Sequence, residues 1–346
     1  MANGRSSTTG ALLGWVAACV SAQPAGADTP AEFYKGKTVN LIIGTSPGND
    51  YDFRGRLLAR FMGRHIPGEP QIVTRNMPGG GGVVAANWLA AIAPRDGTTL
   101  HMIMANMMSA QAMGAQGVAF DTRKLRWVGN TTSTPNVVNS WHTTGITRIE
   151  QTRETELVVG APVGTAGVLY ATALNKIAGT KLKIVTGYPG GGEVNVAMER
   201  GEVSGRGSNS WAAWKSTKPD WIAAKKLNML VQVGLVRHPD LPDVPLLLEL
   251  AATDLDRKVL AFISADTAIS RALVTTEGVP ADRLEALRRA FDRAMRDKDL
   301  LAEAERSKMD LSPSTGEVSQ QIADGIVDTP PDVIARAREL FGDLVK

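Results

Sequence analysis

The chain of 346 residues is long enough for two domains, and its 43% hydrophobic and 21% charged residues are typical of a globular protein. Its 38 basic and 35 acidic residues leave a net charge of only +3, and no lysine- or arginine-rich run occurs. This balance argues against a nucleic-acid-binding protein, which would need a basic patch or stripe.

The first 27 residues have the layout of an export signal. They contain one charged residue, Arg5, then an apolar run at residues 11–22 and the small-residue cleavage pattern AGA at residues 25–27. The run is too short to span a membrane as a helix. The letters VAAC at residues 16–19 also resemble a bacterial lipobox, so lipid attachment at Cys19 is the alternative to simple cleavage. Either way we expect a periplasmic protein.

Cys19 is the only cysteine, so a chain cleaved after residue 27 contains none. Thiol catalysis, disulfide bonds and cysteine-based metal sites are then excluded. The four histidines lie far apart in the sequence, and none has the neighbours of a metal-binding motif. We therefore expect neither a metal ion nor a cofactor.

The opening unit at residues 39–63 is predicted to form a strand, a tight loop and a helix. Residues 39–43 are a short apolar β-rich run, and residues 45–50 are rich in turn-forming side chains. Asp52 stands where we expect the helix N-cap. Such a loop lies at the carboxyl end of its strand beside unpaired helix N–H groups, which is where open α/β sheets bind ligands.

The alternation of strand and helix continues along the first half of the chain. Strands are expected at residues 71–74 and 98–104, with a glycine-rich loop at 76–82 and a helix at 83–91 between them. This order indicates an α/β domain with a mostly parallel sheet and right-handed crossovers.

A second α/β run follows an extended stretch around Pro135, where we place the first crossing between domains. The apolar letters LAFISA at residues 260–265 predict one more strand, and the sequence after them is mainly helical. Strands in the second run are expected at residues 156–161, 183–186, 202–206 and 228–235.

Two glycine motifs admit a catalytic or a cofactor interpretation. Residues 44–48 match the G-x-S-x-G elbow of serine hydrolases, with Ser46 as the nucleophile. The oxyanion hole needs the backbone N–H of the next residue, and Pro47 has none, so we interpret this segment as a tight turn. Residues 80–85 match G-x-G-x-x-A, but the next strand ends at Asn106 instead of the acidic residue that a dinucleotide site requires.

Glycine-rich or hydroxyl-bearing loops precede helices in both halves of the chain. Each is a candidate anion seat, because backbone N–H groups and the helix dipole favour negative charge. One such loop is a weak signal, but several, divided between two α/β units, indicate a cleft that closes on a carboxylate. They are residues 46–52, 79–82, 164–167, 190–192 and 208–210.

Four segments carry a family resemblance: residues 33–63, the N-x-PGGGG loop with APRDGT after it at 76–98, GYPGGGEVNVAMERGEV at 187–203, and LPDVP at 241–245. They resemble the substrate-binding proteins of tripartite tricarboxylate transporters, the TctC or Bug-type receptors, over essentially the whole mature chain. The resemblance implies an α/β type II periplasmic binding protein fold, a Venus flytrap of two lobes with mixed or parallel sheets and a hinge. We expect lobe 1 at residues 28–127 plus 259–346, and lobe 2 at residues 128–258.

The resemblance also implies a function without covalent chemistry. A small organic acid, such as a di- or tricarboxylate, an amino acid or an aromatic acid, would be captured by hinge closure and handed to integral-membrane permease subunits. We expect a monomer. By position, the ligand residues would be Ser46, Pro47, Gly48, Asn49, Asp50, Tyr51, Asp52, Gly79, Gly80, Gly81, Gly164, Thr165, Ala166, Gly167, Gly190, Gly191 and Ser208.

The family's first loop is commonly richer in glycine, whereas Asn49, Asp50 and Tyr51 occupy it in this chain. An Asp50 carboxylate in the cleft would repel an anion or select for an amine. Tyr51 would stack on an aromatic acid or simply cover the helix end. Arg206 ends a predicted strand, where it either pairs with a ligand carboxylate bidentately or points into solvent.

Two functions of other classes stay open at this stage. One is a periplasmic serine hydrolase that uses Ser46, and the other is the ligand-binding component of a sensor system. The substitution Ser46→Ala separates the first from a receptor, because lost turnover with intact binding would favour the enzyme.

Overall fold

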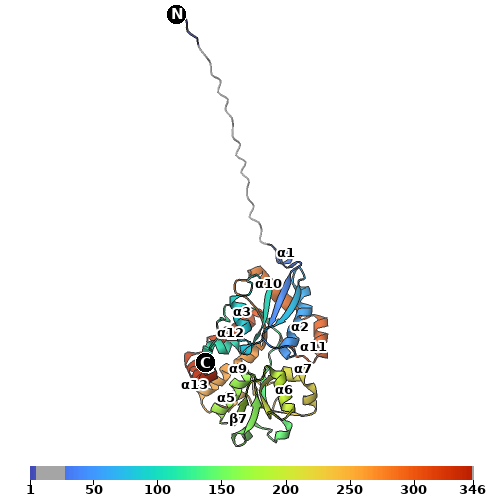
Figure 1. The fold of residues 1–346 in the computed structure, drawn as a ribbon, viewed down its shortest axis with the longest axis vertical. Coiled ribbons are helices and arrows are strands. Elements are labelled where there is room, and N and C mark those ends of the chain that lie inside the picture. The colour runs from blue at the N-terminus through green and yellow to red at the C-terminus, as the bar shows by residue number, and fades with distance from the viewer. Residues whose placement is uncertain (5–27, 345–346) are drawn as a thin grey trace.

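A computed structural model describes residues 1–4 and 28–344. The predicted export signal falls almost wholly outside the described residues, and Cys19 lies outside them. The described chain forms two sheets with helices around each, one above the other in Figure 1. The α/β class with mixed sheets that we expected is confirmed.

The first sheet, in the upper part of Figure 1, has the strand order β11-β4-β10-β3-β1-β2. Strands β1, β2 and β3 are parallel, whereas β10 runs antiparallel to both β3 and β4. The return of the chain through β10 therefore makes this sheet mixed. Its strands are β1 (Thr38–Ile43), β2 (Gln71–Asn76), β3 (Thr99–Met104), β4 (Arg126–Asn130), β10 (Arg271–Thr275) and β11 (Ser314–Thr315).

The second sheet, in the lower part of Figure 1, has the order β7-β6-β8-β5-β9. Strand β6 pairs in parallel with β7 and β8, and β5 is antiparallel to β8 and β9. The carboxyl ends of β6 and β7 therefore lie at one edge of this sheet. Its strands are β5 (Asn136–Trp141), β6 (Leu157–Gly160), β7 (Leu182–Val185), β8 (Gly205–Ser210) and β9 (Leu227–Val233).

Helices surround both sheets. Around the first are α1 (Pro30–Tyr34), α2 (Asp50–Met62), α3 (Val83–Ala91), α4 (Met107–Met113), α10 (Ala281–Ala294), α11 (Lys298–Arg306) and α12 (Gly316–Val327). Around the second are α5 (Ala166–Ala178), α6 (Gly191–Glu199), α7 (Trp211–Thr217) and α8 (Pro219–Ala223). Helices α9 (Asp254–Ala265) and α13 (Pro331–Phe341) pack on each other, and α13 also contacts α4 and α5. The last helix thus touches elements of both halves.

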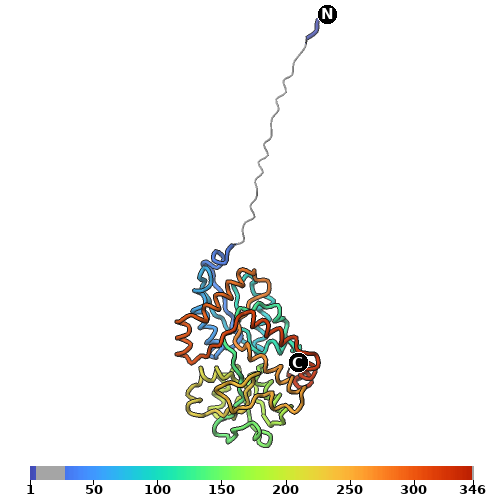
Figure 2. Tube along the Cα trace, turned by 180° about the vertical axis from the view of Figure 1, so that it is seen from behind, coloured from blue at the N-terminus to red at the C-terminus, as the bar shows by residue number. Residues whose placement is uncertain are grey.

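The chain leaves the first sheet once and returns to it. Orange and orange-red segments of the C-terminal part lie with the blue N-terminal ones in the upper part of Figure 2. Strands of the first sheet fall within residues 38–130 and 271–315, and those of the second within 136–233. These positions support our proposed division into a discontinuous lobe 1 (28–127 plus 259–346) and lobe 2 (128–258), although β4 runs past residue 127 to Asn130.

The start of one predicted helix and the type of one predicted element are wrong. Helix α2 begins at Asp50, so Asn49 is its N-cap, and its side chain accepts hydrogen bonds from the N–H groups of Tyr51 at 3.0 Å and Asp52 at 3.2 Å. Asn and Asp cap helices equally well, so the sequence could not choose between positions 49 and 52. Residues 260–265 belong to helix α9, which starts upstream at Asp254 with Thr253 as its cap. A short apolar run alone does not distinguish a strand from a buried helix.

No helix in the described part of the chain is long and apolar enough to cross a membrane.

Candidate functional site

A cavity of about 690 Å³ lies between the two sheets. On one side its walls are the loops after β1, β2 and β3, and on the other the loops after β6 and β7, strand β8 and helix α7. Most of these loops follow the carboxyl end of a strand, where open α/β sheets bind ligands. The cavity is therefore the candidate functional site.

Most of the residues predicted to bind a ligand line this cavity. The exceptions are Pro47, Asp52 and Gly164, which are not part of its lining. Asp52 instead accepts a hydrogen bond from the Gly48 N–H at 3.0 Å and pairs with Arg56 at 3.0 Å. The predicted residues that do line the cavity are Ser46, Gly48, Asn49, Asp50, Tyr51, Gly79, Gly80, Gly81, Thr165, Ala166, Gly167, Gly190, Gly191, Arg206 and Ser208.

Glycine backbones from the two sides meet at the rim of the cavity. Gly81 follows β2 of the first sheet and has φ +63°, a conformation that favours glycine. A Cβ atom built on Gly81 would lie 2.2 Å from the carbonyl oxygen of Gly164, which follows β6 of the second sheet. The Asn106 side chain also donates to that oxygen at 3.3 Å. The two lobes therefore touch here through backbone that has no room for a side chain.

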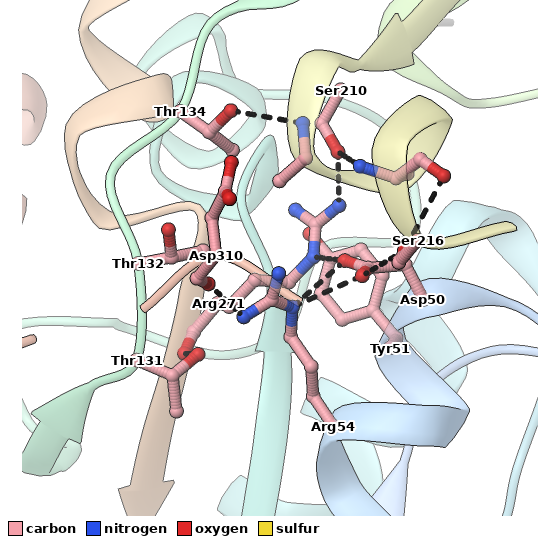
Figure 3. Close-up of polar contacts among 12 residues, drawn as sticks. Asp50, Tyr51, Arg54, Thr131, Thr132, Thr134, Ser210, Ser216, Arg271 and Asp310 are labelled. Atoms are coloured by element: carbon pink, nitrogen blue, oxygen red, sulfur yellow. Dashed lines mark hydrogen bonds and ion pairs between the residues drawn. The ribbon is translucent and has the colours of Figure 1, made fainter. Parts of the chain in front are cut away.

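Asp50 does not offer a free carboxylate to the cavity, because two buried arginines hold it (Figure 3). Arg54 donates from Nε at 3.0 Å, Arg271 donates from Nε at 2.6 Å, and the Ser216 hydroxyl lies 3.3 Å away. Burial alone would raise the pKa of Asp50, but the two guanidiniums outweigh it and hold the pKa below its ordinary value. The carboxylate is ionised and saturated, so it neither repels an incoming anion as a lone charge nor stands ready for an amine.

Tyr51 is also committed to the protein interior. Its hydroxyl donates to the carbonyl of Ser270 at 2.8 Å and accepts from the N–H of Ala105 at 3.2 Å. The guanidinium of Arg271 lies 4.0 Å from the centre of its ring. Because Arg271 covers that face, the face is closed to stacking with an aromatic acid. Tyr51 thus joins the first loop to the return strand β10.

Arg206 does not point into solvent. Only 9% of it is exposed, and it lines the cavity from strand β8. Its Nε donates to the carbonyl of Ser208 at 2.9 Å, and its Nη1 donates to the carbonyl of Gly191 and the side chain of Asn195. Ser208 itself lies within β8 and not in a loop, because the strand continues past the predicted end at residue 206.

Several residues that the sequence reasoning missed also line the cavity. The most important is Arg271, which is 6% exposed and begins β10, 221 residues after Asp50. No local pattern marks it, because an arginine at the start of an apolar strand is common and only the return of the chain brings it to the site. The others include Asn106, Asn136, Tyr170, Ser216 and Lys218.

Polar contacts join the two sides of the cavity at α7. The Nη2 atom of Arg271 donates to the Ser210 hydroxyl at 2.8 Å, and the Ser216 hydroxyl donates to Asp50 (Figure 3). Lys215 forms an ion pair with Asp310 on the side of the first sheet. The Asp50 network therefore connects the two lobes.

Solved structures of other proteins share the fold of this chain. The solved structures that match include the periplasmic binding protein BugD, with a TM-score of 0.70, 17% identity, and coverage of 90% of this chain and 99% of that one. MatC from Rhodopseudomonas palustris with bound malate matches with a TM-score of 0.66, 19% identity, and coverage of 90% and 99%. Rpa4515 from R. palustris with adipate matches with a TM-score of 0.65, 17% identity, and coverage of 89% and 97%.

The chain has the periplasmic binding protein fold. This confirms the fold that the TctC or Bug-type resemblance implied, with two lobes about a cavity. No protein-family model and no curated protein matches the sequence. At identities of 17–19% the similarity shows the fold alone. The residues that line the cavity are therefore the evidence for the kind of ligand that this chain binds.

Ser46 has none of the surroundings of a hydrolase nucleophile. In the described part of the chain, no histidine or carboxylate hydrogen-bonds to its hydroxyl, and its carbonyl accepts from the Asn49 side chain at 2.6 Å. Pro47, which follows it, has no N–H for an oxyanion. The segment is a turn that leads into α2.

Asp266 is a buried acid outside the cavity lining, in the single-turn 3-10 helix between α9 and β10. The Ser109 hydroxyl donates to its Oδ2 atom, while its Oδ1 atom has no partner among the described residues. Burial raises the pKa of Asp266 to about 8. The carboxyl group is therefore protonated at neutral pH in the folded protein.

The raised pKa makes stability depend on pH. An unfolded aspartate has a pKa of about 3.9, so between about pH 4 and pH 8 folding must take up a proton, and stability falls as the pH rises. Asp266→Asn is neutral at every pH. We expect it to be more stable than the wild type by about 5 kcal/mol at pH 8, with the difference shrinking toward zero at pH 4. Urea unfolding at pH 4, 6 and 8 measures this, and a difference independent of pH would refute it.

Proposed function

We propose that the protein is an exported receptor that captures a small organic acid between its two lobes. It would then hand the acid to the membrane permease of a tripartite tricarboxylate-type transporter. The observation that carries the proposal is the cavity of about 690 Å³, which both lobes line and into which they bring loops that begin helices α2, α5 and α6. Backbone N–H groups at such helix starts favour a carboxylate.

The charges of the cavity lining support an anionic ligand. The lining contains the positively charged residues Arg206, Lys218 and Arg271. Asp50 is the only aspartate or glutamate among the described residues that form this lining. Asp50 is already bound by Arg54 and Arg271. Positive charge is therefore in excess at the site. MatC and Rpa4515, which share the fold, hold malate and adipate, and both of these are organic acids.

Hinge closure is the proposed mechanism. An acid that contacts the loops of both lobes binds the closed form better than the open form, and so shifts the population toward closure. Contacts such as Gly81 with Gly164 would form the closed rim. No covalent step is required, and the closed form would be the one that the permease recognises.

We further propose a periplasmic monomer whose export signal is cleaved after residue 27. Lipid attachment at Cys19 is the alternative outcome. The intact mass of the mature protein separates the two, because cleavage after residue 27 removes Cys19 and lipidation retains it with added acyl mass.

Thermal denaturation with a panel of organic acids tests the proposal. A ligand at one hundred times its dissociation constant stabilises the folded state by about 2.7 kcal/mol. We expect at least one di-, tri- or monocarboxylate to raise the melting temperature by several degrees in a concentration-dependent manner. A panel in which no acid shifts the melting temperature would contradict the proposed function.

A further inference from the structure

Arg206 is a buried charge without an ionic partner. Its hydrogen bonds go to the carbonyls of Ser208 at 2.9 Å and Gly191 at 3.1 Å, and to the side-chain oxygen of Asn195 at 2.8 Å, all of which are neutral. Among the described residues, no carboxylate oxygen lies within the 4.0 Å of an ion pair, and the Nη2 atom has no hydrogen-bond partner. Buried charges in proteins are normally paired, so this one stands apart.

The other two buried arginines at this site have a carboxylate partner. Arg54 and Arg271 are 1% and 6% exposed, and both are paired with Asp50. For Arg206, Glu193 is the carboxylate that acts on it from a greater distance, and Glu193 is exposed on the first turn of α6. Burial lowers the pKa of Arg206 to about 10, which leaves it charged at neutral pH.

The surroundings of Arg206 favour an anion. Helix α6 begins at Gly191, and no side chain caps its N-terminus. Its first N–H groups therefore add partial positive charge beside the guanidinium. Trp214 lies on another side, with its ring centre 5.4 Å from the guanidinium carbon, and it brings no negative charge. Gly190, Gly191, Arg206 and Ser208 all line the cavity.

The opposite wall also carries excess positive charge. Arg54 and Arg271 share the one carboxylate of Asp50, so this buried group keeps a net charge of +1. Arg271 lines the cavity from β10. Each lobe therefore presents positive charge to the space between them, and the one carboxylate there is already saturated.

We propose that Arg206 and the N-terminus of α6 form an acid-binding subsite in lobe 2, which selects ligands that carry a second carboxylate. One carboxylate of the ligand would occupy this subsite, and the other would lie at the lobe 1 wall near Arg271. An α-amino acid is disfavoured, because the one carboxylate that the described residues place in the cavity lining, that of Asp50, is already paired with arginines and is not free for an ammonium group. This inference rests on the proposed function and names the ligand class for it.

Gly191 offers a way to test the subsite without removing Arg206. A Cβ atom on Gly191 would lie 2.1 Å from Nη2 of Arg206 and 2.8 Å from its Cζ. The substitution Gly191→Ala must therefore displace the guanidinium. A Cβ atom on Gly325, in helix α12, would meet no other atom within 4 Å, and Gly325 lies outside the cavity lining. Gly325→Ala is thus the matched control for a glycine-to-alanine change inside a helix.

Calorimetric titration with paired probes gives the test. Succinate, malate and adipate are each compared with their monoamides, in which one charge is removed at nearly constant size. For the wild type we expect at least one dicarboxylate to bind about 10- to 100-fold more tightly than its monoamide, the range of a charge-assisted hydrogen bond. Arg206→Gln and Gly191→Ala should reduce this ratio to within about threefold of unity, and Gly325→Ala should leave it at the wild-type value.

The outcomes separate the subsite from the proposed function. If the wild type binds a dicarboxylate and its monoamide equally well, or if both Arg206→Gln and Gly191→Ala keep the full ratio, the subsite is refuted while the receptor function stands. If no acid binds the wild type at all, the receptor function fails and the subsite fails with it. Should Arg206→Gln not fold, Gly191→Ala still decides, because it retains every charge of the protein.

Discussion

The substitution Asp50→Ala is expected to destabilise the protein by about 3–5 kcal/mol, the cost of removing one partner from a buried ion pair. Asp50 is 3% exposed, and it is the carboxylate that Arg54 and Arg271 share. Without it, two buried guanidiniums would face each other with no negative charge between them. Chemical denaturation of the two proteins at pH 7 measures the difference in the free energy of unfolding.

A surface pair supplies the control for this experiment. The Asp299 carboxylate is 71% exposed and pairs with Arg64 at 2.9 Å, so Asp299→Ala should cost no more than about 1 kcal/mol. The pKa of Asp50 is lowered by folding, so its contribution is present above about pH 4 and is lost as the pH falls through the folded-state pKa. The deficit of Asp50→Ala should therefore shrink in acid. Equal costs for the two substitutions would contradict the buried network.

The substitution Gly81→Ala is expected to weaken binding of the organic acid by about 10- to 100-fold, because it holds the rim of the cleft apart. A Cβ atom at this position would stand 2.2 Å from the Gly164 carbonyl oxygen and 2.7 Å from its carbon, in the opposite lobe. Backbone cannot yield as a flexible side chain can. The closed form thus becomes rarer, and the apparent dissociation constant rises by the same factor. Calorimetry with the acid that binds the wild type gives the two constants.

Alanine at position 81 would have two effects: backbone strain at a positive φ, and contact of its methyl group with the opposite lobe. A second glycine with a similar φ distinguishes them. Gly179 has φ +69° at the end of α5, close to the +63° of Gly81, and a Cβ atom there would meet nothing within 4 Å. Gly179→Ala should lose a similar amount of stability but keep the affinity. If Gly81→Ala binds the acid as tightly as Gly179→Ala does, the rim contact plays no part in closure.

Much of the frame of the site could be predicted from local patterns. The run at residues 39–43 and the turn-forming residues after it specify a strand and a loop by their own chemistry, and β1 and α2 are where the pattern placed them, apart from the cap. The glycines at 79–82 all have positive φ, which explains why the loop consists of glycine. Such features depend on neighbours in sequence, so one sequence reveals them.

The electrostatics of the site depend on partners far apart in sequence, and these could not be predicted. The sequence left open whether Asp50 faces the cleft as a charge, and Arg271, 221 residues away, helps to neutralise it. Arg206 was left between two interpretations, because its burial depends on how α6 packs against β8. The helix α9 was missed because its apolar face was judged from six letters without the polar turn before them. Periodicity shows which side of an element is buried, but not what it is buried against.

Arg271 contacts three neighbouring parts of the site. Arg271 holds Asp50 with Nε, covers the ring of Tyr51, and donates to Ser210 across the interface between the lobes. It therefore lies at once in the cavity wall and in the contact between the lobes. An acid bound beside Arg271 would not compete for the contact between Arg54 and Asp50. That ion pair can therefore remain in place when a ligand occupies the cleft.

The most direct test of the account is backbone amide hydrogen exchange with and without the acid that raises the melting temperature most. The account predicts slower exchange in both lobes at once, in peptides that cover the loop at residues 44–52 and the loops at 162–168 and 190–195. Exchange at helix α8, which lies outside the cavity lining, should stay unchanged. Protection confined to the loops of one lobe, or found only away from these loops, would contradict capture of the ligand between the lobes.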